Sequence, residues 1–125
     1  MSANFEPHLK VLTEINLPAF LYALGACESN NNDAAIGRHG ERGRFQIRAS
    51  TWKAATHFPF LCAHASMTSE YVATTILKMY ARILMDHGAA VNPTNLAQLW
   101  NCGTLIGGPN DFARRVNNLY LDASP

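Results

Sequence analysis

Glu28 is the residue of this sequence whose position suits acid–base chemistry best. It closes a mostly apolar segment, residues 17–28, and is followed at once by a polar run, residues 29–33. A carboxyl group at such a boundary can be partly desolvated, which raises its pKa and keeps it protonated near neutral pH. A protonated carboxyl group is what the general acid of a glycosidic cleavage requires. Position alone, however, favours the simpler interpretation of a solvated glutamate at a helix end.

Glu28 is also the first residue in an ordered series of three short motifs. Glu28-Ser29 is followed by GERGRFQI at residues 40–47 and by LAQLWNCG at residues 96–103. This order resembles the soluble lytic transglycosylase family, which is related to goose-type lysozymes. That family has a Glu-Ser pair, then a Gly-Leu-Met-Gln-Ile-like string, then a Tyr-Asn-Ala-Gly-like string before a final helix. The resemblance extends over about residues 17–121, and it implies a lysozyme-like fold that cleaves the glycan strands of peptidoglycan.

The first two motifs imply roles for four residues. Glu28 matches the catalytic acid of the family, and Ser29 matches the serine that supports this acid. Gln46 matches a glutamine that lines the saccharide cleft, and Phe45 takes the place of the usual methionine. A glutamine side chain can both donate and accept hydrogen bonds, so Gln46 can recognise an acetamido or hydroxyl group of a sugar. We therefore expect Ser29, Phe45 and Gln46 on the substrate-binding side of the site.

The third motif and the last helix depart from the family pattern. Asn101 matches the asparagine of the motif, while Trp100 replaces its tyrosine, and the Trp100 ring could face a sugar or belong to the core. Arg115 stands where the family commonly has a tyrosine near the acid. An arginine beside Glu28 would lower the pKa of the acid, the wrong direction for a proton donor. Either Arg115 points elsewhere, or the tyrosine at position 80 or 120 supplies the hydroxyl group.

The resemblance implies a reaction that one carboxyl group can perform. The glutamate protonates the β-1,4 bond between N-acetylmuramic acid and N-acetylglucosamine, then accepts a proton from the C6 hydroxyl group, which closes a 1,6-anhydro ring. Goose-type lysozymes that hydrolyse carry an aspartate two positions after the motif glutamine, where this chain has Arg48. A lytic transglycosylase is therefore favoured over a muramidase or a chitinase-type hydrolase. A hydrolase would need a second carboxylate, for which Glu41 and Asp33 are the candidates, although Glu41 is more simply an exposed loop charge.

Other functional classes find less support in the sequence. The three cysteines, Cys27, Cys62 and Cys102, coexist with five histidines, but no family-like string that would indicate a cysteine nucleophile surrounds them. Their spacing matches no zinc pattern, so we expect small buried thiols and neither a metal nor a cofactor. A catalytically inactive domain that only binds glycan is a further alternative, against which the intact Glu28 and Gln46 argue.

The elements that must position these residues are predicted to form a mainly α single domain over residues 1–125. Residues 5–14 are predicted to form a short amphipathic helix or an N-terminal arm, and helices are predicted over residues 17–28, 49–56, 68–87, 94–103 and from 110 onwards. Thr68, Thr94 and Asn110 are the expected N-caps, and Gly88 and Gly103 the expected ends. The helical spacing predicts a buried stripe made of Val72, Ile76, Met79, Tyr80, Ile83 and Leu84. Residues 34–47 are expected to form a glycine-rich loop or small β-hairpin next to the active-site cleft, and residues 57–65 an irregular connection.

Length, composition and charge narrow the range of functions. The chain has 125 residues, of which 48% are hydrophobic, enough for one domain with a core. Its net charge of +1 argues against nucleic acid as a partner, and no run approaches the about 18 apolar residues of a membrane span. The N-terminus lacks the pattern of a signal peptide. We expect a monomer that acts on peptidoglycan in the periplasm or cell wall. Without a signal peptide, the protein would be exported by another route, be phage-encoded and released by cell lysis, or be a truncated chain.

Overall fold

The computed structural model describes residues 6–124, and these residues form two compact units. Unit 1 comprises the chain up to Ala23 and again from Leu77 onwards, and unit 2 comprises Leu24–Ile76. Within the described residues the secondary structure is six α-helices and one short 3-10 helix, with no strand beyond isolated β-bridges. The predicted mainly helical class is thus confirmed, while the organisation as one domain stays a prediction. No helix in the described part of the chain has the length and apolar character needed to cross a membrane.

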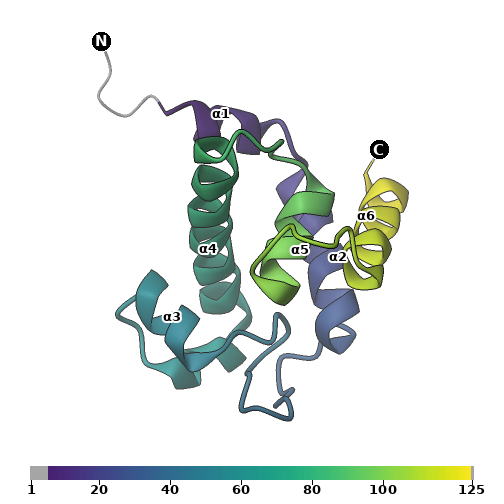
Figure 1. Cartoon of the computed structure of the whole chain (residues 1–125). Coiled ribbons are helices and arrows are strands. Elements are labelled where there is room, and N and C mark those ends of the chain that lie inside the picture. Colours follow the sequence, from purple (N-terminus) through teal and green to yellow (C-terminus); the bar gives the residue numbers. More distant parts are fainter. Residues whose placement is uncertain (1–5, 125) are drawn as a thin grey trace. The chain divides into compact units, whose positions relative to one another are not determined.

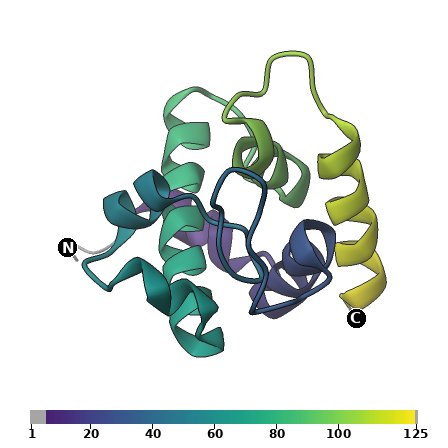
Figure 2. The same ribbon diagram turned by 90° about the horizontal axis from the view of Figure 1, so that it is seen from below.

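Unit 1 is built from helices whose ends carry clear local signals. It contains α1 (Pro7–Thr13), the start of α2 (Leu17–Ser29), the end of α4 (Ser66–Asp86), α5 (Pro93–Cys102) and α6 (Asp111–Ala123). As predicted, Asn110 caps α6, because its Oδ1 accepts a hydrogen bond from the backbone N–H of Ala113 at 2.8 Å. Gly88 (φ 70°) and Gly103 (φ 75°) follow α4 and α5 in the left-handed conformation, also as predicted. Figure 1 shows α5 and α6 side by side, and Figure 2 shows residues 103–110 arching between them.

The core of unit 1 is aliphatic and is closed by aromatic contacts. Its buried apolar side chains are Leu12, Ala19, Phe20, Ala23, Leu77, Ala81, Leu84, Val91, Leu96, Ala97, Leu99, Ala113 and Val116. The Phe20 and Tyr120 rings meet edge to face, with centroids 6.3 Å apart. This contact joins α2 to α6, and the Tyr120 hydroxyl oxygen also accepts a hydrogen bond from the backbone N–H of Asn16.

Unit 2 is organised around a long connection between α2 and α3. It contains the end of α2, residues 30–48, α3 (Ala49–Ala55), the 3-10 helix η1 (Phe60–His64) and the start of α4. Residues 30–48 carry no helix (Figure 2), and their backbone is held by antiparallel bridges from Arg42 to Ile36 and Ile47. The buried apolar side chains of this unit are Leu24, Phe45, Ile47, Trp52, Ala63, Val72, Ala73 and Ile76. The buried side chains of Phe45 and Ile47 therefore anchor segment 30–48 to the core of unit 2.

The starts of α4 and α5 and the connection after α3 differ from the sequence prediction. Helix α4 begins at Ser66, two residues before the expected cap Thr68. Helix α5 is capped by Asn92, whose Oδ1 accepts from the N–H of Asn95 at 2.8 Å, so the expected cap Thr94 lies inside the first turn. Pro93 suits that first turn because it has no N–H to satisfy. The connection after α3 is also more regular than predicted, since residues 60–64 form the 3-10 helix.

The buried stripe of α4 is rotated from the predicted one. Val72, Ile76 and Leu84 are buried as expected, but Met79 is 38% exposed and Ile83 is 45% exposed. The stripe is completed by the buried side chains of Ala73, Leu77 and Ala81. Apolar residues flank this stripe on both sides, so helical spacing alone does not identify its centre. The small alanines lie at that centre because they allow neighbouring elements to approach the helix closely.

Candidate active site

Glu28 lies at the end of α2, as the sequence predicted. It is the penultimate residue of the helix, and its side chain is half-buried. The helix stops because Asn30 (φ 58°) and Asn31 (φ 56°) both adopt the left-handed conformation, which asparagine tolerates better than most residues. The Asn31 N–H donates to the Gly25 carbonyl oxygen at 3.0 Å. This hydrogen bond closes the turn that ends α2 directly after Glu28 and Ser29.

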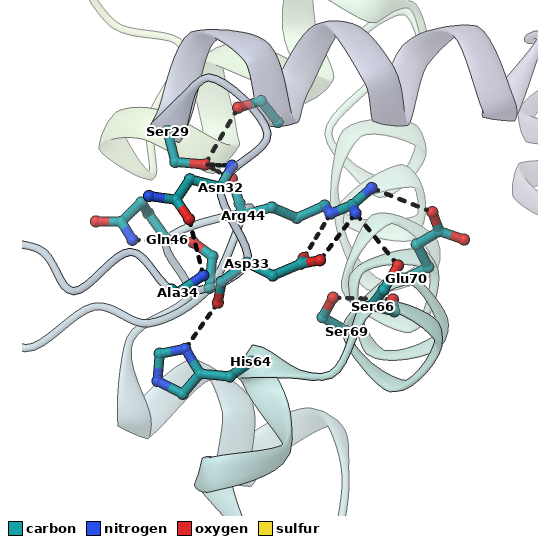
Figure 3. A network of polar contacts seen from close by, with 12 residues as sticks. Ser29, Asn32, Asp33, Ala34, Arg44, Gln46, His64, Ser66, Ser69 and Glu70 are labelled. Atoms are coloured by element: carbon teal, nitrogen blue, oxygen red, sulfur yellow. Dashed lines mark hydrogen bonds and ion pairs between the residues drawn. The ribbon is translucent and has the colours of Figure 1, made fainter.

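Ser29 links this helix end to the loop of residues 30–48. Its Oγ donates to the Arg44 carbonyl oxygen at 2.7 Å and accepts from the Asn32 N–H at 3.0 Å (Figure 3). The hydroxyl group is thus engaged with backbone groups of its own unit. We assign Ser29 a positioning role, since its hydroxyl group holds the end of α2, next to Glu28, against the turn of residues 43–46 that carries Gln46.

Gln46 is held in an unusual backbone conformation. Its φ of 51° is rare for a residue other than glycine, and such outliers cluster at functional sites. Its Nε2 donates to the carbonyl oxygens of Gly43 at 2.9 Å and Ala35 at 3.3 Å. The two amide hydrogens are therefore used within the loop, and Oε1 is the atom that can accept a hydrogen bond from a ligand. Gly37 makes this arrangement possible, because a Cβ atom there would collide with Gln46 Oε1.

Phe45 does not present its ring to a ligand. Its side chain is 1% exposed, so the expectation of a substrate contact at this position is wrong for the structure as it stands. Residues 43–46 form a turn, and within this turn the Phe45 side chain takes the inward direction. Its role is to anchor the segment from which Gln46 projects.

Asp33 is committed to an ion pair. Its Oδ1 and Oδ2 accept from Nε and Nη2 of Arg44 at 2.7 and 3.1 Å, a bidentate arrangement. The hydrogen bonds from Arg44 are the main cause of a lowered pKa of the Asp33 carboxyl group. Arg44 also donates to Ser66 Oγ at 3.2 Å and lies 3.6 Å from a carboxylate oxygen of Glu70 (Figure 3). Arg44 therefore fastens the loop to the start of α4, while Asp33 is held by Arg44 and is a poor candidate for a catalytic base.

Glu41 is ionised and turned towards its own loop. Its Oε1 accepts from the His39 N–H at 2.8 Å. The backbone N–H of Glu41 itself is the main cause of a lowered pKa of the carboxyl group; partial burial raises the pKa, and the backbone N–H of His39 lowers it further. Two arginines that follow Glu41 in the sequence have partners elsewhere: Arg44 pairs with Asp33, and the Arg42 guanidinium lies 5.0 Å from the centre of the Phe60 ring. Glu41 is half-buried and approaches Gly37, as Gln46 does.

The two residues from the third motif belong to unit 1. Trp100 is half-buried, and its ring meets that of Tyr80 edge to face, with centroids 6.1 Å apart. Burial raises the pKa of the Tyr80 phenol. Asn101 is exposed, and its Oδ1 accepts from Nδ2 of Asn110 at 2.9 Å, which ties the end of α5 to the cap of α6. Arg115 is exposed on α6.

Gln98 is a structural residue that the sequence analysis did not single out. Its side chain is 3% exposed, with Oε1 accepting from the Asn110 N–H at 2.8 Å and Nε2 donating to Cys102 Sγ at 3.1 Å. It also fills the space over Gly108, where a Cβ atom would lie 2.6 Å from its amide. The sign of this role in the sequence is that Gln98 is a polar residue between Leu96 and Leu99, which both face inward. A buried amide with partners on both sides is what such a position requires.

The cysteines differ from the expected buried thiols. None forms a disulfide, Cys27 and Cys62 are half-buried, and Cys102 is exposed. The Cys102 thiol donates to the carbonyl oxygens of Gln98 and Thr104, both at 3.3 Å. Within residues 6–124, no three histidine, cysteine, aspartate or glutamate side chains gather in a way that could hold a metal ion.

Comparisons with protein-family models, with curated proteins and with solved structures found no match to this chain.

Proposed function

We propose that this chain is a lytic transglycosylase with a lysozyme-like fold, acting on the β-1,4 bond between N-acetylmuramic acid and N-acetylglucosamine of peptidoglycan. The observation that carries the proposal is the end of α2, where Glu28 is half-buried and the adjacent Ser29 is clamped to the loop that bears Gln46. Partial burial and the negative end of a helix both favour the neutral form of a carboxyl group. Such a group can serve as a general acid at neutral pH.

The proposed reaction needs no water and no second carboxylate. The Glu28 carboxyl group transfers its proton to the glycosidic oxygen as the bond from that oxygen to C1 of the muramic acid breaks, and N-acetylglucosamine leaves with a free 4-hydroxyl group. The Glu28 carboxylate then accepts the proton of the C6 hydroxyl group, whose oxygen bonds to C1. The product is a 1,6-anhydro-muramic acid, and Glu28 is protonated again. The same residue acts as acid and then as base.

The state of the other carboxylates supports this one-carboxylate mechanism. Both oxygens of Asp33 are bound by Arg44, which commits this carboxylate to the ion pair and lowers its pKa, so Asp33 is a weak base. Glu41 has one oxygen engaged by the His39 N–H and a lowered pKa, which makes it a weak base. In the proposal, Gln46 Oε1 accepts a hydrogen bond from the acetamido N–H or a hydroxyl group of the sugar.

A hydrolase of the muramidase or chitinase type is the second candidate, and one observation favours it. Glu41 is ionised and lies on the same loop as Gln46, with both side chains approaching Gly37. An ionised carboxylate in that place can hold a water molecule for attack on C1. The two candidates therefore differ in one residue, because only the hydrolase requires Glu41.

The first experiment is mass spectrometry of the fragments released from purified peptidoglycan. The transglycosylase predicts products lighter by one water than reducing-end fragments, no activity for Glu28→Gln, and retained activity for Glu41→Gln. Reducing-end products that disappear in Glu41→Gln would establish the hydrolase instead. Products from peptidoglycan that persist in a folded Glu28→Gln variant would remove Glu28 from the mechanism. Binding of wall glycan without any product would leave a binding domain.

A further inference from the structure

A ligand-sized hollow lies in unit 2, on residues that the candidate active site does not use. It has a volume of about 370 Å³ and is lined by Ala55, Thr56, His57, Phe58, Tyr71 and Thr75. This volume falls at the lower end of the roughly 300–1,000 Å³ typical of small-molecule sites. Phe58 is 48% exposed and Tyr71 is 65% exposed, and their rings meet edge to face with centroids 6.3 Å apart. The hollow thus offers two aromatic side chains to solvent.

The exposed Phe58 ring is mounted on a backbone that is held from both sides. The Phe58 N–H donates to Thr56 Oγ1 at 3.2 Å, and its carbonyl oxygen accepts from Nε1 of Trp52 at 2.7 Å. Trp52 is 1% exposed and is therefore a fixed support. Pro59 follows and restricts Phe58 to extended backbone. An aromatic ring that is fixed in place but left half in water contributes little to the core, whereas it is well prepared to bind a ligand.

Two threonine hydroxyl groups beside the rings have fixed hydrogen-bonding directions. Thr75 Oγ1 donates to the Tyr71 carbonyl oxygen at 3.2 Å, so towards the hollow it can act only as an acceptor. Thr56 Oγ1 accepts from the Phe58 N–H, so its own hydrogen remains for donation. The lining therefore combines one oriented donor, one oriented acceptor and two aromatic rings. Among the lining residues, His57 and Tyr71 are the two with titratable side chains. No lysine, arginine, aspartate or glutamate lines the hollow.

We infer that this hollow binds a pyranose ring of an uncharged oligosaccharide, at a site separate from Glu28. The C–H groups of a pyranose carry partial positive charge, which suits the negative face of an aromatic ring. A sugar hydroxyl group both donates and accepts, which matches Thr75 and Thr56 respectively. The absence of a charged group in the lining disfavours a charged ligand. The choice of N-acetylglucosamine among pyranoses rests on the proposed function, whereas the hollow itself indicates only a neutral sugar ring.

The test is an NMR titration of the Glu28→Gln protein with the tetramer of β-1,4-linked N-acetylglucosamine, in which no turnover obscures binding. We expect saturable shifts of the backbone amides of Phe58, Tyr71 and Thr75. Tyr71→Ala should weaken this binding about tenfold, equivalent to about 1.4 kcal/mol. Thr75→Val should weaken it by a smaller factor, since one hydrogen bond is lost. Met67→Ala is the matched control, because Met67 is an 86% exposed apolar residue one turn earlier on α4.

The outcomes separate this inference from the proposed function. If the amides around Glu28 and Gln46 show saturable shifts and those of the hollow do not, the inferred pyranose site is overturned and the proposed active site is supported. An equal response to a tetramer of β-1,4-linked glucose would support a pyranose site and overturn the choice of N-acetylglucosamine. Equal loss of binding in Tyr71→Ala and Met67→Ala, or no saturable shift in the lining with either tetramer, would overturn the inference. The amide spectrum of each variant reports directly whether the protein is folded.

Discussion

The side chains of Ser29, Gln46 and Glu41 in the candidate site are held largely by backbone partners rather than by each other. Ser29 donates to the Arg44 carbonyl oxygen, Gln46 to those of Gly43 and Ala35, and Glu41 accepts from the His39 N–H. Backbone groups are fixed by the fold, so each of these side chains has little freedom left. A site built this way is preorganised for a ligand, which reduces the entropy lost on binding.

The Asp33–Arg44 ion pair gives a prediction for stability at acidic pH. Since Arg44 lowers the pKa of Asp33 in the folded protein, the stabilisation is complete above the unfolded value of about 3.9 and is lost as pH falls through the lower folded value. Asp33→Asn should therefore lower the free energy of unfolding at pH 7 by about 1 kcal/mol or less, because the pair is partly exposed. Urea unfolding in steps from neutral to strongly acidic pH measures this difference, which should disappear at the acidic end.

A matched control for the ion pair is Asp122→Asn, which changes an exposed aspartate of α6. It should leave the free energy of unfolding almost unchanged at every pH. A difference between wild type and Asp33→Asn that stays constant across the pH range would contradict the assignment of this effect to the ion pair.

Among the elements, segment 30–48 does most to place the candidate site. It carries Glu41 and Gln46, yet it contains no helix and is held by antiparallel bridges, by Ser29 and by the Arg44 network. Gly43 lets it approach η1, since a Cβ atom at this position would collide with the Ala63 carbonyl oxygen. Its φ of 81° also lies in the region that favours glycine. The position of the segment therefore depends on the absence of a side chain at residue 43.

Gly43→Ala should destabilise the protein more than Gly40→Ala. Both glycines have a positive φ (81° and 82°), but a Cβ atom on Gly40 would have no atom within 4 Å. The shared cost of the left-handed conformation is about 1–2 kcal/mol, and the collision with Ala63 should add about 1–3 kcal/mol for Gly43→Ala alone. Urea unfolding of the two variants measures the difference. Equal free energies of unfolding would mean that segment 30–48 does not depend on this contact.

At the scale of the whole chain, positive charge is unevenly distributed. The net charge is only +1, but five of the ten lysines and arginines lie within residues 38–53: Arg38, Arg42, Arg44, Arg48 and Lys53. Within that stretch the only acidic residue is Glu41. Arg38, Arg48 and Lys53 are exposed. Unit 2 thus combines the candidate acid with a local excess of positive charge, which suits a polymer whose peptide stems carry carboxylates.

The double variant Arg38→Gln/Arg48→Gln should bind peptidoglycan more weakly than the wild type at low salt. Added salt should weaken the wild type towards the level of the variant, because exposed charges are screened beyond about 10 Å at 0.1 M ionic strength. Sedimentation binding to purified peptidoglycan over a range of salt concentrations measures this effect. Lys78→Gln, an exposed cation of α4 in unit 1, is the control and should behave like the wild type. Binding that does not respond to salt or to the double variant would show that these cations do not recognise the polymer.

The sequence by itself was sufficient for features that depend on residues within a few positions of one another. Helix α2 was predicted to within one residue, and Asn110, Gly88 and Gly103 act at the helix ends where they were expected. Caps and left-handed helix ends are local, because the hydrogen bonds that define them join residues three to five positions apart. The same locality placed Glu28 at a helix end before a polar turn.

Only the tertiary structure decided what depends on contacts between distant segments. It selected Ala73, Leu77 and Ala81 for the core of α4 in place of Met79 and Ile83. It also paired Arg44 with Asp33, eleven residues away, and directed the Gln46 amide to two backbone carbonyls of its own loop. Several partners of similar chemistry compete for each such group along the chain. The choice among them follows from packing, which sets the distances between segments and which no local pattern of residues encodes.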